Sequence, residues 1–235
     1  MQQFNEDVIG KALLAYLDGD STPNIIVKSS FGEDTLSIPY LFRTAKQLPK
    51  IEKTALKLCK GKVLDVGAGS GCHSLILQKR KMNVKAIDVS KGAVEVMMKR
   101  KINAFHIDFH EETNQFDTLL FLMNGVGIAG TIKGLKKLLK KAKILLNVDG
   151  QILLDSSDIS YMFTEDDGSM KINLNAPYYG EVSFQMQYKD IKTQPFDWLF
   201  IDFELLENIA KPLGYKCELI INGPHFDYLA KLSLK

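Results

Sequence analysis

The most informative segment of this 235-residue chain reads Val63-Leu64-Asp65-Val66-Gly67-Ala68-Gly69-Ser70-Gly71. Its first four residues have the pattern of a buried strand, and three closely spaced glycines follow them at once. Gly67 permits a tight turn, Gly69 lets a ligand approach the backbone, and Gly71 lets the next helix start close to the strand. A helical pattern, Ser74–Lys81, comes next. The segment therefore predicts a strand, a ligand-binding loop and a helix, in that order.

Downstream of this loop, strand and helix patterns continue to alternate. The segment Phe116–Met123 is nearly all apolar, as expected for a central parallel strand that is covered on both faces. Such alternation predicts an open, mostly parallel sheet with helices on both faces. The expected strands are Val63–Val66, Val84–Ile87, Ala104–Ile107, Phe116–Met123 and Gln151–Leu154, and the expected helices between them are Ser74–Lys81, Lys91–Arg100 and Ile132–Leu146.

The end of the chain departs from this alternation. A helix is expected over Phe203–Pro212, and strands over Tyr215–Ile221 and Tyr228–Leu234. The link Asn222-Gly223-Pro224-His225 is too short for a parallel crossover, so the last strand must run antiparallel to its neighbour. The expected fold is an α/β, Rossmann-like sheet of seven strands with an antiparallel last strand.

Two further parts flank this sheet. Residues 1–60 are interpreted as a helical and extended cap packed on the core, and residues 61–235 as the main domain. Residues 158–200 form an insertion after the fifth strand, in which Val182, Phe184, Met186 and Tyr188 alternate with polar residues at strand spacing. We expect the insertion to form a β-hairpin with Trp198–Ile201 and to act as an acceptor-site lid. In the cap, helices are expected over Asp7–Leu17 and Lys50–Cys59, and extended pieces over Ile25–Lys28 and Leu36–Ile38.

The glycine spacing separates two kinds of ligand. A dinucleotide site has the spacing G-x-G-x-x-G, which would place its third glycine at position 72, where this chain has Cys72. Here the spacing is G-x-G-x-G, with Asp65 two residues before the first glycine. S-adenosylmethionine has no phosphate to place at a helix N-terminus, but it has an ammonium and a sulfonium, for which a nearby acid is useful.

On these residues, and over about Lys62–Lys235, the chain resembles the class I S-adenosylmethionine-dependent methyltransferases. The resemblance implies that Asp88, at the end of the second strand, binds both ribose hydroxyls, and that Asp108, after the third, touches the adenine amino group. A carboxylate suits a diol because it accepts two hydrogen bonds. Ile107 replaces a glycine that the family often has before this acid. The cofactor-binding residues implied in this way are Asp65, Gly67, Ala68, Gly69, Gly71, Asp88, Val89, Asp108, Phe109, Asn124 and Gly125, with Arg43 as a partner for the methionine carboxylate.

The acceptor is marked less clearly than the donor. The loop Asn124–Gly127 resembles neither the D/N-P-P-Y box of enzymes that methylate amino groups of nucleic acids nor a catalytic-cysteine motif. We therefore expect a small-molecule acceptor, and no residue identifies itself as a catalytic base. Aromatic residues of the cap and the insertion are candidates for the acceptor pocket, namely Tyr16, Tyr40, Tyr179 and Trp198.

Composition sets the remaining expectations. The formal net charge of +2 gives no sign of nucleic-acid binding, although a basic run over Lys133–Lys143 motivates an alternative acceptor, RNA or protein. A dinucleotide-dependent oxidoreductase is a weaker alternative because of Cys72, and a non-catalytic cofactor-binding module is a third. The three cysteines suit a reducing, cytoplasmic setting, and the N-terminus has no signal-peptide pattern. We expect no membrane span and no metal site, and the sequence does not determine an oligomeric state.

Overall fold

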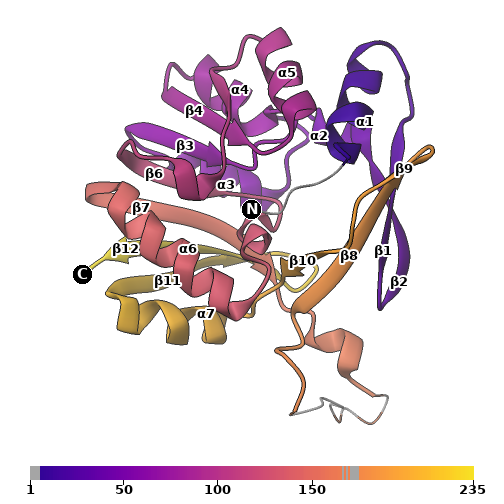
Figure 1. The fold of residues 1–235 in the computed structure, drawn as a ribbon. Coiled ribbons are helices and arrows are strands. Elements are labelled where there is room, and N and C mark those ends of the chain that lie inside the picture. The colour runs from indigo at the N-terminus through magenta and orange to yellow at the C-terminus, as the bar shows by residue number, and fades with distance from the viewer. Residues whose placement is uncertain (1–5, 166, 168, 170–174) are drawn as a thin grey trace.

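A seven-stranded sheet in the order β11-β12-β7-β6-β3-β4-β5 forms the centre of the computed structural model (Figure 1). Neighbouring strands from β7 to β5 pair in parallel. Only β12 runs against its neighbours, because it pairs antiparallel with both β11 and β7. This confirms the expected seven-stranded fold. The strands are β3 (Lys62–Val66), β4 (Asn83–Asp88), β5 (Ala104–His106), β6 (Phe116–Phe121), β7 (Leu146–Ser157), β11 (Tyr215–Asn222) and β12 (Asp227–Leu234).

The structure describes residues 6–165, 167, 169 and 175–235. The first five residues of the expected cap, and residues 166, 168 and 170–174 of the expected insertion, lie outside the described residues. Within the described part of the chain, no helix combines the length and the apolar character that a membrane crossing would need.

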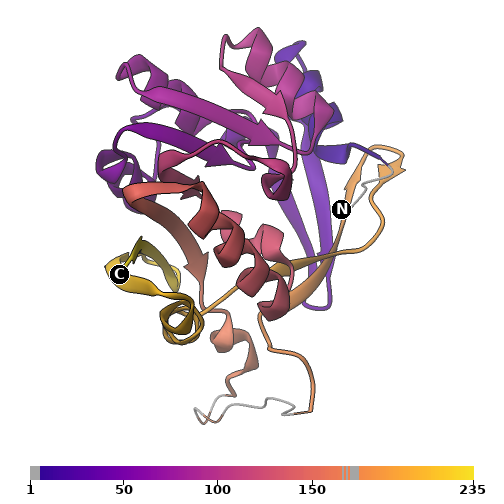
Figure 2. The ribbon, with the colours of Figure 1, turned by 60° about the vertical axis from the view of Figure 1, so that its left-hand side comes forward.

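Helices cover both faces of this sheet (Figure 2). Successive residues of a strand point to opposite faces, so Val63 packs in the cluster that contains Leu56 and Leu77, whereas Leu64 packs in the cluster that contains Leu135. The first face is covered by α3 (Lys50–Leu58) and α4 (Cys72–Lys79), with α5 (Lys91–Lys99) beside them, and the second by α6 (Ile132–Leu145) and α7 (Phe203–Ala210).

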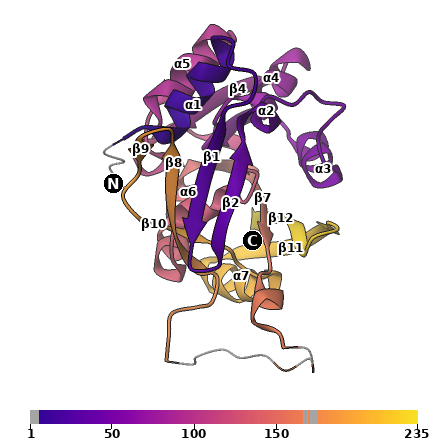
Figure 3. The ribbon, with the colours of Figure 1, turned by 90° about the vertical axis from the view of Figure 1, so that its right-hand side faces the viewer.

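A second, smaller sheet joins the cap to the insertion, which the sequence analysis treated as separate parts. Strand β8 pairs antiparallel with β10 on one side and with β1 on the other (Figure 3). The register places Met186 opposite Val27, and Phe184 opposite Phe196. The alternating pattern predicted each strand, but a pattern within one segment contains no information about a distant partner. Its strands are β1 (Asn24–Ser29), β2 (Gly32–Ser37), β8 (Glu181–Tyr188), β9 (Ile191–Lys192) and β10 (Phe196–Leu199).

The first helix of the cap, α1 (Val8–Leu17), lies against α5. Asp7 caps α1, because its Oδ1 accepts a hydrogen bond from the Gly10 amide at 2.9 Å. Its Oδ2 accepts one from the Gly92 amide in α5 at 2.8 Å. A Cβ atom at Gly92 would lie only 2.6 Å from the Gly10 Cα. One carboxylate and two glycines therefore hold the cap close to the main sheet.

Several predicted boundaries were wrong by a few residues. Ile38 begins the short helix α2 (Ile38–Leu41) instead of ending a strand, and Pro39 suits that position because proline is tolerated in the first turn of a helix. Helix α4 begins at Cys72, directly after left-handed Gly71. The hairpin partner in the insertion is β10, which begins and ends two residues before the predicted Trp198–Ile201. Strand β7 is longer than predicted at both ends, and α7 ends two residues early.

Candidate active site

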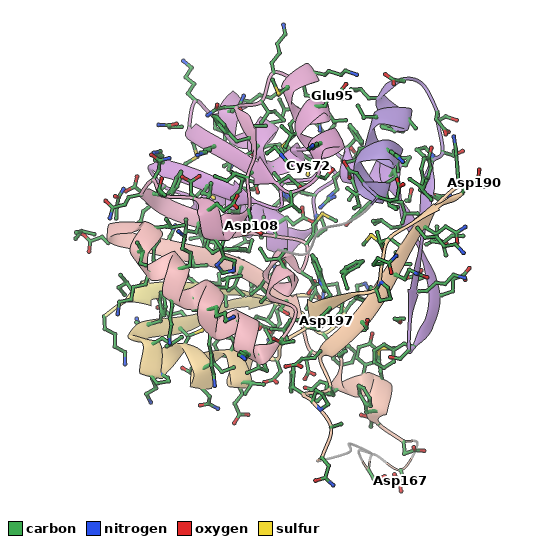
Figure 4. The ribbon with its side chains drawn as sticks, viewed as in Figure 1. Cys72, Glu95, Asp108, Asp167, Asp190 and Asp197 are labelled. Atoms are coloured by element: carbon green, nitrogen blue, oxygen red, sulfur yellow. The ribbon has the colours of Figure 1, made fainter. Side chains whose placement is uncertain are left out.

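A cavity of about 430 Å³ lies where the carboxyl ends of β3, β4 and β5 meet the second sheet. Its floor includes Gly67, Gly69 and the two acids Asp88 and Asp108. Its roof comes from the start of the cap and from the insertion. Asp108 is labelled in Figure 4, where it lies beside the main sheet. Ligands in open α/β sheets bind at the carboxyl ends of the strands, so the cavity has the expected location. The roof residues are Glu6, Asp7, Val8, Ile9, Met186, Thr193, Phe196 and Trp198.

The glycines of the loop after β3 differ in their surroundings. Gly67, Gly69 and Gly71 all have positive φ angles, of 64°, 56° and 78°. A Cβ atom at Gly67 or Gly69 would meet no atom within 4 Å, so open space lies above these two residues. A Cβ atom at Gly71 would lie 2.4 Å from Ile102 Cδ1, inside the packed core. The first two glycines leave room for a ligand, and the third leaves room for packing.

Asp88 ties this loop to the end of β4. Its Oδ2 accepts a hydrogen bond from the Gly69 amide at 2.8 Å, and its Oδ1 accepts one from the Ser90 amide at 2.8 Å. Burial raises the pKa of Asp88, and the two amide donors oppose that rise. The neighbouring Val89 is 45% exposed and lines the cavity. The carboxylate is thus held in place while its side chain borders the open space.

Asp108 occupies the corresponding position after β5. Its Oδ1 accepts a hydrogen bond from the His110 amide at 2.7 Å and so caps the short 3-10 helix η1 (Phe109–Glu111). Phe109 is buried, and its ring lies 5.2 Å from the ring of Phe121. Asp108 and Phe109 line the cavity, together with Ile107 and His110.

The loop after β6 leads into the cavity wall. Asn124 and Gly125 do not line the cavity, but they begin the 3-10 helix η2 (Gly125–Ala129), whose last two residues, Ile128 and Ala129, do. A Cβ atom at Gly127 would lie 2.0 Å from Trp198 Nε1. The insertion therefore packs directly on η2.

Comparison with known proteins identifies the family. No family model and no curated protein matches the sequence at a significant level. A solved S-adenosylmethionine-dependent methyltransferase from Bacteroides fragilis, in complex with S-adenosyl-L-homocysteine, is 45% identical to this chain, with a TM-score of 0.91 over 97% of this chain and 94% of that one. The chain belongs to the S-adenosylmethionine-dependent methyltransferases. This confirms the predicted enzyme class and, with it, S-adenosylmethionine as the methyl donor.

More distant structures share only the fold of this methyltransferase. The sugar N-methyltransferase KedS8 from Streptoalloteichus sp. ATCC 53650 is 13% identical, with a TM-score of 0.54 over 81% of this chain and 87% of that one. The CcbJ methyltransferase from Streptomyces caelestis is 12% identical, with a TM-score of 0.59 over 80% of this chain and 90% of that one. The family assignment excludes the alternative of a dinucleotide-dependent oxidoreductase, which the sequence had left open.

The acid of the glycine motif, Asp65, lies beneath the loop and not in the cavity of the methyltransferase. Its Oδ2 accepts a hydrogen bond from the Ser74 hydroxyl of α4 at 2.7 Å. Burial raises its pKa, and His73 and Ser74 oppose that rise. The side chain points to α4 because residues alternate along β3, and Asp65 shares a face with Val63. Ala68 and Gly71 do not line the cavity either, so direct cofactor contacts by these three residues stay a prediction.

Arg43 forms a buried ion pair. Its Nη2 donates to both carboxylate oxygens of Glu52 at 2.5 Å, and Glu52 also contacts His73 Nε2. Burial alone would lower the pKa of His73, but contacts with Cys72 and Glu52 raise it to about 10. The expectation that Arg43 pairs with the methionine carboxylate has no support in this arrangement, because Glu52 already takes its guanidinium. His73 is likewise held in this cluster, outside the cavity lining.

Of the four aromatic acceptor candidates, only Trp198 lines the cavity. The ring of Tyr16 lies 4.6 Å from that of Phe42. Tyr40 is 46% exposed and lies under the Arg43 guanidinium, and the Tyr179 hydroxyl donates to Asp158 Oδ1 at 2.9 Å. Several cavity residues of the roof were not among the predicted site residues. The strand pattern that contains Met186 was recognised, but no signal in the sequence indicated that one face of this strand borders the cavity. The residues missed are Glu6, Asp7, Val8, Ile9, Met186, Thr193 and Phe196.

Among the described residues, no group of three His, Cys, Asp or Glu side chains is arranged to hold a metal ion.

Proposed function

We propose that this methyltransferase acts on a small-molecule acceptor that is neutral or cationic where it meets the cavity. The observation that carries the proposal is the lining of the cavity. Within the described part of the chain, the lining residues include the carboxylates of Glu6, Asp7, Asp88 and Asp108 but no lysine or arginine. A site for a nucleic-acid backbone or another phosphate would present basic side chains. The negative lining suits a cationic donor and an acceptor without phosphate groups.

The donor fits the residues that border the cavity. Open space lies above Gly67 and Gly69, where a bound molecule can approach the backbone. Each oxygen of Asp88 accepts one amide hydrogen bond, and a carboxylate offers about four acceptor positions. Acceptor positions therefore remain for the two ribose hydroxyls. Asp108, Val89 and Phe109 are proposed to surround the adenine.

The bound donor would supply a methyl group that is already activated by its sulfonium. The chain then has to hold the acceptor in line with that group and keep water away, and such positioning contributes much of the rate in a two-substrate reaction. Trp198 and Phe196 suit this role because their aromatic rings form an apolar part of the cavity wall. Trp198 rests on Gly127, which couples the wall to the loop after β6.

The fold supports the proposal in a second way. It is the fold of KedS8, whose name gives it as a sugar N-methyltransferase, and of CalS10, named as an amino pentose methyltransferase. Both names describe the methylation of a sugar. The predicted division into a cap of residues 1–60 and a main domain of residues 61–235, with residues 158–200 as an acceptor-site lid, is part of the same proposal.

The acceptor class is tested with methyl-labelled S-adenosylmethionine. The enzyme is incubated in parallel with a size-filtered metabolite extract, with total tRNA and rRNA, and with a protein extract. We expect label in the metabolite fraction. Label found only in RNA or protein would overturn the small-molecule proposal and favour the alternative of a macromolecular acceptor.

A pair of variants tests the roof. Trp198→Ala removes an aromatic wall, and we expect the rate of label transfer at limiting acceptor to fall about tenfold. Asp197→Asn is the matched control, because Asp197 is the adjacent, exposed residue of β10, labelled in Figure 4, and it does not line the cavity. Equal rates for the two variants would show that the roof does not contact the acceptor.

A further inference from the structure

A run of four polar residues, Asp155-Ser156-Ser157-Asp158, ends β7 at the edge of the sheet that carries the cavity. Each side chain binds another segment of the chain. Ser156 Oγ accepts from the Ile201 amide at 3.0 Å, and Ser157 Oγ donates to Asn124 Oδ1 at 3.2 Å. Asp158 accepts from Tyr179, as described above. Asp155 is the residue of this run that is bound to the backbone after β6.

Asp155 holds two consecutive residues in a costly backbone conformation. Met123 and Asn124 have φ angles of 63° and 54°. The left-handed region costs an L-residue about 1–2 kcal/mol, with asparagine among the more tolerant. Asp155 Oδ2 accepts from the Met123 amide at 3.1 Å, and Oδ1 accepts from the Asn124 amide at 2.8 Å. Both oxygens of one buried carboxylate are thus used to fix this turn.

The turn sets the position of a cavity wall. Asn124 is the residue from which η2 starts, and its carbonyl accepts a hydrogen bond from the Gly127 amide at 2.8 Å. Gly127 packs on Trp198, and Ile128 and Ala129 line the cavity. A change in the turn therefore moves the wall and its contact with the roof together.

We propose that Asp155 is a positioning residue for methyl transfer, because its carboxylate holds the left-handed turn Met123–Asn124 and so fixes η2 against the cavity. Asp155 does not line the cavity itself, and it acts through the turn. The inference holds for any acceptor, since it concerns the wall beside the donor.

The charge state of Asp155 gives the proposal a distinctive pH dependence. Burial raises the pKa of Asp155 to about 7, against the opposing effect of the two amide donors. The charged groups that act on it from α3 and α4 are Glu52, which raises the pKa, and His73, which lowers it. Only the carboxylate form accepts well through both oxygens, so the turn loses one acceptor as the pH falls through 7.

The stability that Asp155 contributes changes with pH in the opposite direction to the turnover rate. A carboxyl group whose pKa is higher in the folded than in the unfolded chain stabilises the fold at low pH, and that contribution is lost as the pH rises through 7. Falling pH from 8 to 6 should therefore lower the turnover rate without lowering the stability contributed by this group. A purely structural role for Asp155 would not separate the two quantities.

The experiment compares Asp155→Asn with Asp117→Asn. Asp117 is a matched carboxylate at the opposite end of β6, where it accepts from the Lys62 amide at 2.6 Å and the Asn147 side chain at 2.8 Å. Turnover is followed with labelled S-adenosylmethionine and the extract fraction that accepts label, donor affinity by calorimetry with S-adenosylhomocysteine, and backbone order over 123–129 by hydrogen exchange. For Asp155→Asn we expect about 10- to 100-fold slower turnover at pH 8 and faster exchange in this segment. We also expect that the turnover rate no longer changes as the pH passes through 7.

The control variant, Asp117→Asn, is expected to keep the turnover rate of the unmodified enzyme and the fall in that rate as the pH falls through 7. The proposal is overturned if Asp155→Asn turns over at the unmodified rate, or if the two variants lose the same turnover and show the same exchange. If Asp155→Asn does not fold, two variants at Asn124, one with valine and one with glycine, test the proposal instead. Valine resists the left-handed conformation and glycine adopts it freely. Asn124→Val should then be about tenfold slower than Asn124→Gly, and equal rates for this pair would also overturn the proposal.

Discussion

Gly69 and Gly71 lie two residues apart in one loop, yet an added methyl group would meet different surroundings at each. Above Gly69 there is open space, and the residue borders the cavity. A Cβ atom at Gly71 would lie 2.4 Å from Ile102 Cδ1 and 2.8 Å from Met97 Cγ, both in the core. The sequence predicts ligand approach at Gly69 and a close start of the helix at Gly71. Their surroundings assign ligand approach to one and packing to the other.

This difference predicts that two alanine variants differ in what they lose: mainly ligand binding for Gly69→Ala, and mainly stability for Gly71→Ala. Gly69→Ala should cost about 1–2 kcal/mol of stability from its positive φ alone, but it should weaken S-adenosylhomocysteine binding strongly, because the new methyl group enters the donor space. Gly71→Ala should lose about 1–3 kcal/mol more, from overpacking against Ile102 and Met97. Thermal denaturation and calorimetry on both variants check this. The assignment fails if Gly71→Ala is the more stable of the two.

From the sequence, a residue could be placed at the cavity where its backbone position alone decides. Asp88 ends β4 and Asp108 follows β5, and the carboxyl ends of parallel strands meet at one edge of the sheet, so both border the cavity. Prediction was weaker where side-chain direction decides. Asp65 lies within β3 and points to Ser74. Arg43 is turned toward Glu52, a partner nine residues further along the chain that no motif indicated.

At the scale of elements, the contact between α1 and α5 positions the start of the cap over the cavity. The helices approach closely because both have glycine at the contact, and Asp7 accepts hydrogen bonds from an amide of each. Helix α1 was predicted from its apolar spacing. Its contact with α5 was not predicted, because a glycine in each of two helical patterns does not indicate that the two helices pack closely.

Replacing Gly92 should therefore affect a distant part of the site. The Cβ atom of Gly92→Ala would lie 2.6 to 2.8 Å from the backbone of Gly10, which has no flexible side chain to move aside. We expect α1 to lift from α5, with faster hydrogen exchange over residues 8–17 and about tenfold weaker S-adenosylhomocysteine binding, since residues 6–9 form part of the roof. Glu95→Ala is the matched control, an exposed position of α5 labelled in Figure 4. Unchanged exchange in α1 would contradict the role of this contact.

On the scale of the whole molecule, the central sheet was predictable and the second sheet was not. The main sheet is built from consecutive strand–helix units, so local periodicity predicts its strands, and one short link predicts the antiparallel last strand. The second sheet pairs β1 with β8, which lie far apart in the chain. Such pairing follows from how the cap and the insertion meet above the cavity. That meeting closes the site with residues from both parts.

The charge distribution of the whole molecule provides the last test of the acceptor. Lys136, Lys137 and Lys140 are exposed on α6, which covers one face of the main sheet, and none of them lines the cavity. If the acceptor is a small molecule, reversing all three charges to glutamate should leave label transfer within about threefold of the unmodified rate, because exposed charges are screened over about 8 Å at physiological salt. Reversal of the exposed Lys46, Lys50 and Lys57 controls for the change in net charge. A loss of transfer confined to the α6 variant would instead indicate that this lysine face binds an anionic macromolecule, since only there would attraction to such an acceptor have been removed.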